Sequence, residues 1–434
     1  MHGFSTDHTP SVAIETHGCK LNQADSADLA REFVQAGYSV LSSKDSVDIY
    51  VVNTCTITHV ADRKARHSIR SARRRNPEAT IVAAGCYPQR SPEALSSLDE
   101  VDLIVGNKDK PTLVRQVGEW RGVVPVPCAI GDVPNAASPK IARTRAMVKI
   151  QEGCDQVCSY CIVPKVRGRE RSIPSDSIVR VIGQRVEEGY KEVILTGTQL
   201  GTYGLDQDEV TLSGLIERIL DETEVMRLRV SSLQPQEIEP DLISSWANSR
   251  LCPHFHMPLQ SGSDQILKKM KRRYTGEEYL NAVNLIRSMV PNAAISTDII
   301  VGFPGETESQ FSETCRLVDN AMFAKIHVFP YSERPGTSAS YFSDNVPRTQ
   351  ILERVSRIID LGQISAMEFR KGLVGSIRSV LWEGSESGQG PYLWKGITDN
   401  YVKVTCLSQR WLANEITDAR LCDAKDEMVS VELI

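Results

Sequence analysis

Residues 146–161, AMVKIQEGCDQVCSYC, join a short apolar run to three cysteines, Cys154, Cys158 and Cys161. The apolar run predicts a buried strand that ends just before the cysteines. Three thiolates on one loop can surround a single small centre. Structural zinc normally takes four nitrogen or sulfur ligands, and a bacterial ferredoxin has a fourth cysteine three residues after its third, so neither pattern is complete. We therefore expect an iron–sulfur cluster with one open iron; the alternative is a loop of buried or zinc-bound cysteines.

A second set of cysteines is scattered along the chain. Cys19, Cys55 and Cys86 each follow an apolar run, in VAIETHGC, VDIYVVNTC and TIVAAGC. In an open α/β sheet, ligands gather outside the carboxyl ends of the strands. Taken singly, each could be a core residue, because free cysteine is among the most buried residue types. Their repeated placement at strand ends predicts a second cluster, again with one open iron.

The hydrophobic pattern divides the chain into regions and predicts a mixed α/β protein. Over 1–123, short apolar runs alternate with amphipathic stretches, which indicates an open parallel α/β sheet. Residues 124–145 carry four prolines without a clear period and are predicted to be a linker. Over 146–368 the alternation resumes, with a long amphipathic helix expected after Pro347. Residues 369–434 change to period two, which predicts a small OB-like β-barrel.

Six strand-like runs in the central region suggest a partial (βα)6 barrel, whose reactive groups should lie at strand C-termini. They are AMVKIQ, EVILTGT, RLRVSSL, FHMPLQ, ISTDIIVGF and KIHVFPYS. In the last region the strand-like runs are VGSIRSVLW, YLWKGITDNYVKV and EMVSVELI.

Composition limits the class of protein. The 434 residues correspond to roughly three domains at about 150 residues each. Apolar residues at 41% and charged residues at 24% are ordinary for a globular protein and disfavour disorder. No apolar stretch is long enough to span a membrane and no secretory signal is evident, so we expect a cytoplasmic protein with no membrane partner. Its eleven cysteines are then expected to be metal ligands or core residues rather than disulfides.

With both cysteine triplets in view, the chain resembles the radical S-adenosylmethionine (SAM) methylthiotransferase family over nearly its whole length. The motifs that carry the resemblance are THGCKLNQADS (16–26), VVNTCTIT (51–58), AAGCYPQR (83–90), KIQEGCDQVCSYCIVPKVRGRERS (149–172), PLQSGSDQILKKMKRRYT (258–275), STDIIVGFPGETE (296–308) and HVFPYSERPGT (327–337). The C-terminal strands resemble the TRAM domain, a small RNA-binding β-barrel.

Within the family, Lys20, HVFPYS and GITDNYVKV are most similar to the branch that acts on threonylcarbamoyladenosine beside the tRNA anticodon. The branches that act on isopentenyladenosine or on a ribosomal-protein aspartate share the cysteines. The chain departs from the first branch where Ala24 and Asp25 stand in place of an aromatic and an acidic residue, and where Lys165 replaces an aromatic. These departures bear on the substrate and not on the chemistry.

The resemblance implies an enzyme that inserts a methylthio group at carbon 2 of a hypermodified adenosine in tRNA, using two [4Fe-4S] clusters and two SAM molecules. The Cys154, Cys158 and Cys161 cluster would cleave SAM to a radical, and the other would carry the sulfur. A reduced flavodoxin- or ferredoxin-type protein would supply electrons, and no DNA partner is expected. Two alternatives stay open: a radical SAM enzyme whose second cluster only transfers electrons, and a non-catalytic tRNA-binding protein with structural metal.

The resemblance also suggests which residues hold SAM. Tyr160 would lie beside the adenine, and the stretch Thr196, Gly197 and Thr198 would bind the amino group. Ser231 and Gln260 are candidate ribose or carboxylate contacts. Val301 would offer backbone groups to the adenine and Phe329 would flank it. For these positions a tight turn or simple strand packing is the alternative. The absence of a G-x-x-x-x-G-K-[ST] loop weighs against an ATPase.

Positive charge is local, because the whole chain has a net charge of −5. Seven basic residues lie on a predicted helix after Cys55 and could hold tRNA phosphates, although such a run is usually a solvated face: Arg63, Lys64, Arg66, Arg70, Arg73, Arg74 and Arg75. Arg167, Arg169 and Arg171 form a second candidate group.

Residues 370–434 hold eight basic and nine acidic residues, so RNA binding there would need aromatic stacking. The candidate aromatics are Tyr392, Trp394 and Tyr401. His254 and His256 alternate on one strand and are expected to be packed rather than metal ligands. The remaining cysteines are expected to be linker or packing residues: Cys128, Cys252, Cys315, Cys406 and Cys422.

Overall fold

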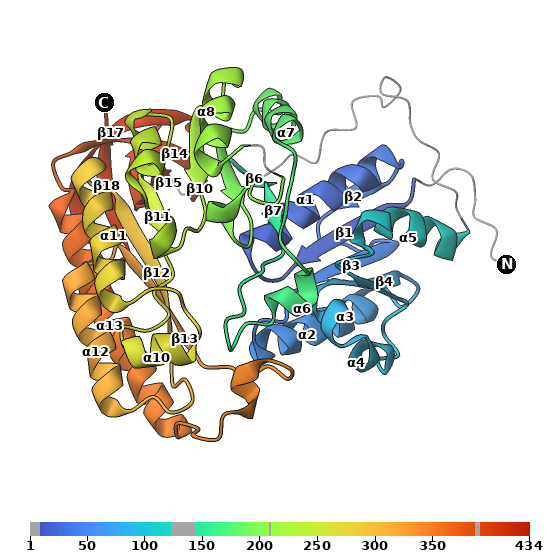
Figure 1. The fold of residues 1–434 in the computed structure, drawn as a ribbon. Helices are drawn as coiled ribbons and strands as arrows, with labels where there is room; N and C mark the ends of the chain where they lie inside the picture. The colour runs from blue at the N-terminus through green and yellow to red at the C-terminus, as the bar shows by residue number, and fades with distance from the viewer. Residues whose placement is uncertain (1–8, 123–143, 208–209, 387–390) are drawn as a thin grey trace. The chain divides into compact units, whose positions relative to one another are not determined.

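The computed structural model describes residues 9–122, 144–207, 210–386 and 391–434, and these form two compact units (Figure 1). The first unit holds the described residues up to 122 together with 162–169, and the second holds the rest. Apart from Thr144 and Arg145, the predicted linker lies outside the described residues, as does Cys128. Over the described ranges, no helix has both the length and the apolarity needed to cross a bilayer.

A five-stranded parallel sheet forms the centre of the first unit, in the order β2-β1-β3-β4-β5. The alternation of apolar runs and helices predicted this sheet. The edge strand β2 was missed because it has only three residues and little burial. The strands are β1 (Ser11–Thr16), β2 (Ser39–Leu41), β3 (Ile49–Thr54), β4 (Thr80–Gly85) and β5 (Leu103–Gly106).

Helices cover both faces of this sheet, as a buried parallel sheet requires. Phe33 of α1 and Val117 of α5 belong to the core on one face. Ile69 of α2 and Leu95 of α4 belong to the core on the other. The helices of this unit are α1 (Lys20–Gln35), α2 (His59–Arg75), α3 (Cys86–Arg90), α4 (Pro92–Ser96), α5 (Leu113–Arg121) and α6 (Val163–Arg167).

The second unit contains the six predicted parallel strands, in sequence order, as two three-stranded sheets. Among the described residues, an isolated bridge between Leu228 and Leu251 continues the pairing from one sheet to the other. A short antiparallel pair, β7 (Gln151–Glu152) with β8 (Arg171–Ser172), was not predicted. The parallel strands are β6 (Arg145–Lys149), β9 (Glu192–Thr196), β10 (Arg227–Val230), β11 (His254–His256), β12 (Ala294–Val301) and β13 (Lys325–Pro330).

Amphipathic helices pack against these strands around one large core. In Figure 1, α11, α12 and α13 run side by side along one flank of the unit. The 25-residue α13 begins directly after Pro347, as predicted. The helices are α7 (Ser175–Glu187), α8 (Leu212–Glu222), α9 (Pro240–Ser244), α10 (Asp264–Lys269), α11 (Gly276–Met289), α12 (Glu308–Ala321) and α13 (Arg348–Gly372).

The C-terminal strands close into a barrel in the order β14-β15-β16-β18-β17, around the fully buried Trp382 and Trp394. The sequence predicted one run where the chain forms β15 and β16, and it missed β17. The turn between β15 and β16 contains Tyr401 with a φ of 71°. The strands are β14 (Ile377–Glu386), β15 (Tyr392–Thr398), β16 (Lys403–Ser408), β17 (Ile416–Lys425) and β18 (Met428–Leu433).

A buried ion pair fixes this barrel to the parallel strands of the same unit. Arg229 of β10 donates two hydrogen bonds to the Glu192 carboxylate of β9, at 2.8 and 2.9 Å, and both side chains are fully buried. Arg229 also donates to the Asp399 carbonyl at 2.9 Å and lies 4.7 Å from the centre of the Tyr401 ring. Arg227 donates to Ser379 Oγ at 2.9 Å.

Replacing Arg229 with Met should lower the free energy of unfolding by about 3–5 kcal/mol, because the buried Glu192 carboxylate loses the two hydrogen bonds that Arg229 donates and keeps only the longer ion pair with Arg227 at 3.8 Å. Urea denaturation followed by circular dichroism measures the change. The matched control is Arg218→Met, which removes an arginine paired at the surface with Glu222 and Asp176 and should change nothing measurable. Equal effects of the two substitutions would contradict the assignment.

Candidate functional site

The first cysteine triplet lies at one edge of the five-stranded sheet. Cys19, Cys55 and Cys86 come just after β1, β3 and β4, which are neighbours in the sheet. Helices α1 and α3 begin at or directly after their cysteines. Between β1 and β3 the strand order reverses, and ligands of open α/β sheets bind at such a switch point. The prediction that three strands deliver cysteines to one edge is confirmed.

The backbone before Cys19 touches Cys55. A Cβ atom added at Gly18 would lie 2.6 Å from Cys55 Cβ and 3.2 Å from its Sγ, so only glycine fits there, and its φ is 113°. Cys55 and Cys86 are buried, whereas Cys19 is exposed. Burial, together with the neighbouring thiols of Cys86 and Cys19, raises the pKa of the Cys55 thiol to about 12. Asn107 Nδ2 donates to Cys86 Sγ at 3.3 Å.

Arg167 lies in the interior of the first unit. Its Nη2 contacts Asn22 Oδ1 and forms an ion pair with Asp25 at 3.2 Å, and Lys110 pairs with the same carboxylate at 2.8 Å. Asn22 in turn donates to the carbonyls of His17 and Thr54, which flank the cysteine-bearing turns. The prediction that Arg167 binds tRNA phosphates is therefore wrong for this structure, because its guanidinium is buried and already paired.

The second triplet occupies the loop after β7. Cys154 is buried, whereas Cys158 and Cys161 are half-buried. Burial raises the pKa of the Cys154 thiol to about 11. The loop is held by Ser159, whose backbone N–H donates to the Met270 carbonyl at 3.0 Å and whose Oγ donates to the Lys269 carbonyl at 2.8 Å. The cysteines therefore sit on a loop with a fixed anchor.

Arg272 is a site residue that the sequence did not reveal. Its Nη1 donates to Cys158 Sγ at 3.5 Å, its Nε donates to Tyr274 Oη at 3.0 Å, and its guanidinium lies 4.9 Å from the Tyr274 ring centre. The Arg272 guanidinium thus lies beside one of the three cysteines of the second triplet. Arg272 lies in the motif 258–275, but nothing in the sequence connects that motif to Cys158.

Both triplets offer the donor set that an iron–sulfur cluster takes. In the described part of the chain, no three His, Cys, Asp or Glu side chains converge as a single-ion metal site requires. A cluster is held differently, by cysteine thiolates that bind separate iron atoms. Three cysteines at one site are one ligand short of the four that structural zinc normally takes, and they match the thiolate ligands of an iron–sulfur cluster.

The loop after β9 provides a polar cradle near the second triplet. The backbone N–H groups of Thr198 and Gln199 donate to Gln151 Oε1 at 2.8 and 3.0 Å. A Cβ added at Gly197 would meet Leu200 at 2.8 Å and the Gln151 carbonyl at 3.0 Å. Thr198 Oγ1 is buried and finds no hydrogen-bond partner among the described residues. The predicted stretch 196–198 thus presents an unsatisfied polar group.

The other predicted SAM contacts differ in accessibility. Ser231 is buried directly after β10, and Val301 is buried with its carbonyl already accepting from the Tyr331 N–H at 2.8 Å. Gln260 has a φ of 67°, which strains a residue other than glycine. Phe329 is exposed on β13.

Tyr160 is the predicted adenine neighbour, and its ring packs edge-on against Phe303, with centres 6.4 Å apart. Burial raises its pKa well above the usual value. Phe303 follows β12, so the structure brings Tyr160 to the end of that strand.

Two carboxyl groups beside these loops titrate near neutral pH and were missed by the sequence analysis. Burial raises the pKa of Glu237 to about 7, although its carboxylate accepts from the Gln234 N–H at 2.8 Å. Burial and the nearby Asp155 raise the pKa of Glu170 to about 7 as well. The Glu170 backbone N–H donates to Asp155 Oδ1 at 3.3 Å, so it adjoins the cysteine loop. Such groups can hold or release a proton at physiological pH.

His254 and His256 are hydrogen-bonded strand residues, as predicted. Each ring shares Ser296 Oγ, at 3.1 and 3.0 Å. His254 also stacks on Tyr401, with ring centres 4.4 Å apart.

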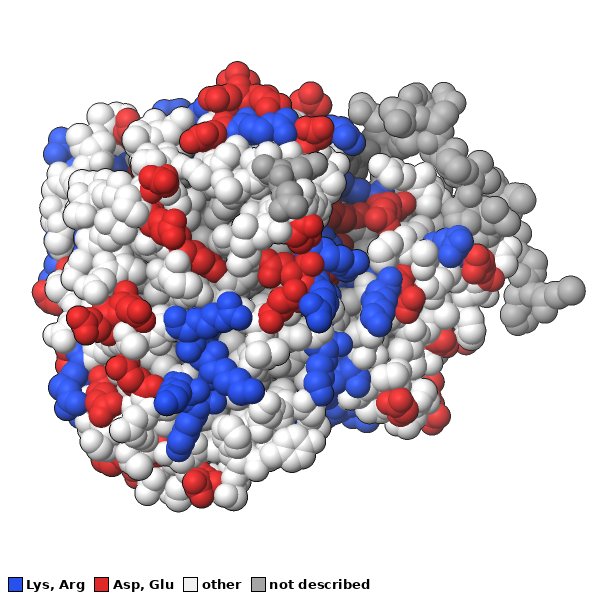
Figure 2. Space-filling model, viewed as in Figure 1, with Lys and Arg blue, Asp and Glu red and all other residues white. Residues whose placement is uncertain are grey.

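The basic helix α2 contains both engaged and free cations. Arg73 is held by Asp102 at 2.6 Å, Arg70 and Arg75 lie near Glu100 and Glu15, and Arg66 donates to Tyr87 Oη. Arg63, Lys64 and Arg74 are exposed, and within the described ranges no carboxylate pairs with them. Figure 2 shows that Lys and Arg side chains gather in groups on the viewed face, which explains how an acidic chain presents positive patches. Arg169 and Arg171 are also exposed.

The aromatic residues expected to stack on RNA are mostly unavailable. Trp394 is fully buried, and Tyr401 is enclosed by His254 and Arg229, so these two assignments are wrong for this structure. Tyr392 is half-buried. Trp411, which the sequence analysis did not single out, is 62% exposed and packs edge-on against Trp394. It is therefore the aromatic surface that this barrel offers. Of the remaining cysteines, Cys422 is exposed and the buried ones are Cys252, Cys315 and Cys406.

Comparison with known proteins agrees with this geometry. Residues 11–106 match the family described as Uncharacterized protein family UPF0004, and residues 148–318 match the Radical SAM superfamily. A radical SAM methyltransferase, TsrM from Kitasatospora setae, has a similar fold, with a TM-score of 0.55 and 14% identity over 88% of this chain and 82% of its own.

Curated relatives match most of the chain. The threonylcarbamoyladenosine tRNA methylthiotransferase MtaB of Bacillus subtilis is 34% identical over 95% of this chain and 94% of its own length. The enzyme of the same name from Aquifex aeolicus is 37% identical, over 91% and 96%. A tRNA-2-methylthio-N(6)-dimethylallyladenosine synthase of Methylacidiphilum infernorum is 34% identical, over 93% and 90%. With both cysteine triplets in place and relatives of this identity along its length, the chain belongs to the radical SAM tRNA methylthiotransferases.

Proposed function

We propose that this protein adds a methylthio group to carbon 2 of N6-threonylcarbamoyladenosine next to the anticodon of tRNA. The relatives from Bacillus subtilis and Aquifex aeolicus are named for this nucleoside, and the second is 37% identical. The Methylacidiphilum infernorum relative is named for dimethylallyladenosine. The observation that carries the chemistry is the pair of cysteine triplets, one at the carboxyl ends of three parallel strands and the other on the single loop that follows β7.

We assign one [4Fe-4S] cluster to each triplet. When bound, the cluster on Cys154, Cys158 and Cys161 would supply the electron that cleaves SAM, and the cluster on Cys19, Cys55 and Cys86 would supply sulfur. The chain's own task is to hold the thiols, exclude water and orient the substrate. Because Cys55 and Cys154 are buried, they are shielded from water. A flavodoxin- or ferredoxin-type electron donor and a cytoplasmic location stay predictions.

For SAM, the residues available are Tyr160, Thr196, Gly197, Thr198, Ser231, Gln260, Val301 and Phe329. The unsatisfied Thr198 hydroxyl supports a polar ligand there. For tRNA, the exposed cations Arg63, Lys64, Arg74 and Arg171 are available; Lys64, Arg74 and Arg171 would contact phosphates, with Trp411 as a stacking surface.

Nucleoside mass spectrometry tests the substrate. Total tRNA from cells that lack the protein should retain N6-threonylcarbamoyladenosine and lose its 2-methylthio derivative, and the gene supplied in trans should restore the derivative. Unchanged levels of that derivative, or loss of the dimethylallyl derivative instead, would show that the substrate is a different one.

Cys55→Ala should separate the two halves of the reaction. We expect SAM cleavage to 5′-deoxyadenosine to persist while methylthiolation falls below detection, with about four irons lost per protein. Cys422→Ala is the control, because that exposed cysteine belongs to neither triplet, and it should keep both activities. Loss of SAM cleavage in Cys55→Ala would argue against separate roles for the triplets.

Arg272→Gln should lower the reduction potential of the Cys158 cluster, since a positive charge beside a thiolate favours the reduced state. Redox titration followed by electron paramagnetic resonance measures this shift independently of turnover. Arg272→Lys keeps the charge and should recover most of the potential. If Arg272→Gln has the same reduction potential as the wild type, Arg272 contributes only packing and does not tune the cluster.

Trp411→Ala should weaken tRNA binding by about fivefold to a hundredfold, the effect of losing one stacking surface. Fluorescence anisotropy with labelled tRNA measures the Kd, and SAM cleavage without tRNA should be unaffected. Leu407→Ala, which removes an exposed aliphatic side chain from the same barrel, should leave the Kd unchanged. Equal Kd values for Trp411→Ala and the wild type would remove Trp411 from the interface.

A further inference from the structure

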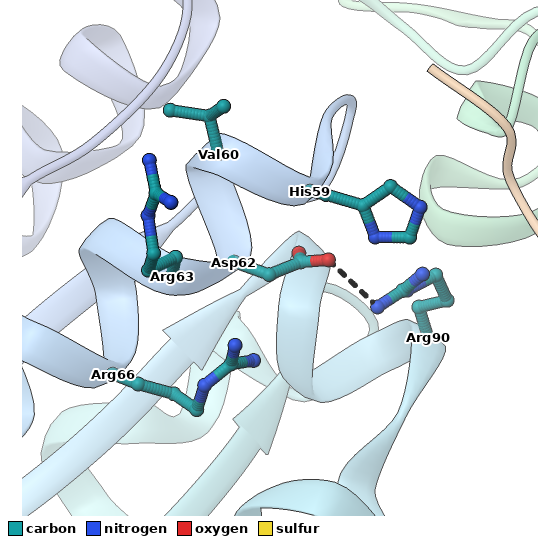
Figure 3. A pocket seen from close by; sticks show the side chains of 6 residues that line it. All are labelled: His59, Val60, Asp62, Arg63, Arg66 and Arg90. Atoms are coloured by element: carbon teal, nitrogen blue, oxygen red, sulfur yellow. Dashed lines mark hydrogen bonds and ion pairs between the residues drawn. The ribbon is translucent and has the colours of Figure 1, made fainter.

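A cavity of about 370 Å³ opens in the first unit beside the start of α2 and the end of α3. Figure 3 shows the side chains around it: Arg63 and Arg66 extend from α2, and Arg90 extends from α3 toward Asp62. The cavity is lined by His59, Val60, Asp62, Arg63, Arg66 and Arg90.

The cavity carries an excess of positive charge. Asp62 is buried and is the one carboxylate in the lining; it pairs with Arg90 at 3.0 Å and accepts from Thr56 Oγ1 at 2.6 Å. Arg66 donates to Tyr87 Oη at 2.7 Å, a neutral partner that leaves its charge uncompensated. Arg63 is exposed, and in the described structure no carboxylate pairs with it or with Arg66. Two guanidinium charges are therefore available to an anion.

The cavity is built on the same turns that carry the first triplet. Thr56, whose hydroxyl holds Asp62, directly follows Cys55, and α2 begins four residues after that cysteine. Helix α3 starts at Cys86 and ends at Arg90, a span of about 6 Å at 1.5 Å per residue. His59 and Arg90 of the lining are thus each four residues from a cysteine of the first triplet, which puts the cavity within reach of a substituent on an adenine held at the thiols.

We infer that this cavity binds the carboxylate of the threonylcarbamoyl group, an inference that rests on the proposed function. Arginine binds carboxylates with paired, charge-assisted hydrogen bonds, and Arg63 and Arg66 both have donors to spare. Val60, which is exposed in the lining, offers an apolar contact for the threonine methyl group. A dimethylallyl group has no acceptor, so it would leave both charges desolvated without a partner. The cavity therefore selects the acidic nucleoside.

The test uses the cluster-loaded enzyme and two tRNAs that differ only at the modified adenosine, one with the free threonyl carboxylate and one with its methyl ester. The Kd and the single-turnover methylthiolation rate are measured for wild type, Arg63→Gln and Arg66→Gln. We expect each substitution to weaken binding of the acid by about tenfold or more and binding of the ester by less than about twofold. Arg74→Gln removes a cation from the same helix outside the cavity and should affect both tRNAs equally.

The other outcomes are distinct. If the variants lose the same affinity for the acid and the ester, and the slope of log K against log salt concentration falls by about one phosphate contact, the cavity binds a backbone phosphate. That result would overturn the inference. No loss on either tRNA would overturn it too. Failure of the proposed function looks different, because the wild-type enzyme would then leave the acid-bearing tRNA unthiolated whatever the variants bind.

Discussion

Parallel strand pairing is the constraint on which both cysteine sites depend. In a parallel sheet every strand ends at the same edge, so β1, β3 and β4 bring Cys19, Cys55 and Cys86 together although long stretches of chain separate them. The same geometry places the loops after β6 and β9 beside each other. Both faces of such a sheet must be covered by other elements, and accordingly every residue of β3 and β4 is buried.

The sequence predicted most of the fold because buried parallel strands appear as continuous apolar runs. It missed β2, which is too short to produce a pattern, and β17, whose acidic residues obscure the alternation of Ala419 and Leu421. At the site, the cysteines could be found from spacing and position. Arg272, Glu170 and Glu237 could not, because their roles arise from contacts across the fold. Arg167 looked like a surface cation because its partner Asp25 lies 142 residues away.

Charge acts at short range in this protein. A net charge of −5 says little about binding, since single helices and turns hold most of the local excess. Of the seven Lys and Arg side chains on α2, five contact acidic or polar neighbours or line a cavity, and the other two are exposed to solvent. Basic residues on one helix therefore have different roles: some stabilise the fold, some are available to an anion and some are only solvated, depending on the groups that each side chain contacts.

The attachment of the terminal barrel has a consequence for how such proteins can be rearranged. Arg227 and Arg229 belong to the parallel strand β10, yet the barrel supplies acceptors for their hydrogen bonds: the Ser379 hydroxyl and the carbonyls of Ile397 and Asp399. A chain that ended after α13 would expose to solvent the Arg229–Glu192 ion pair, which is fully buried in the intact protein. A foreign barrel grafted there would need matching carbonyls at its own turn. The barrel is therefore not a freely exchangeable module, and any gene fusion that swaps it must rewrite β9 and β10 as well.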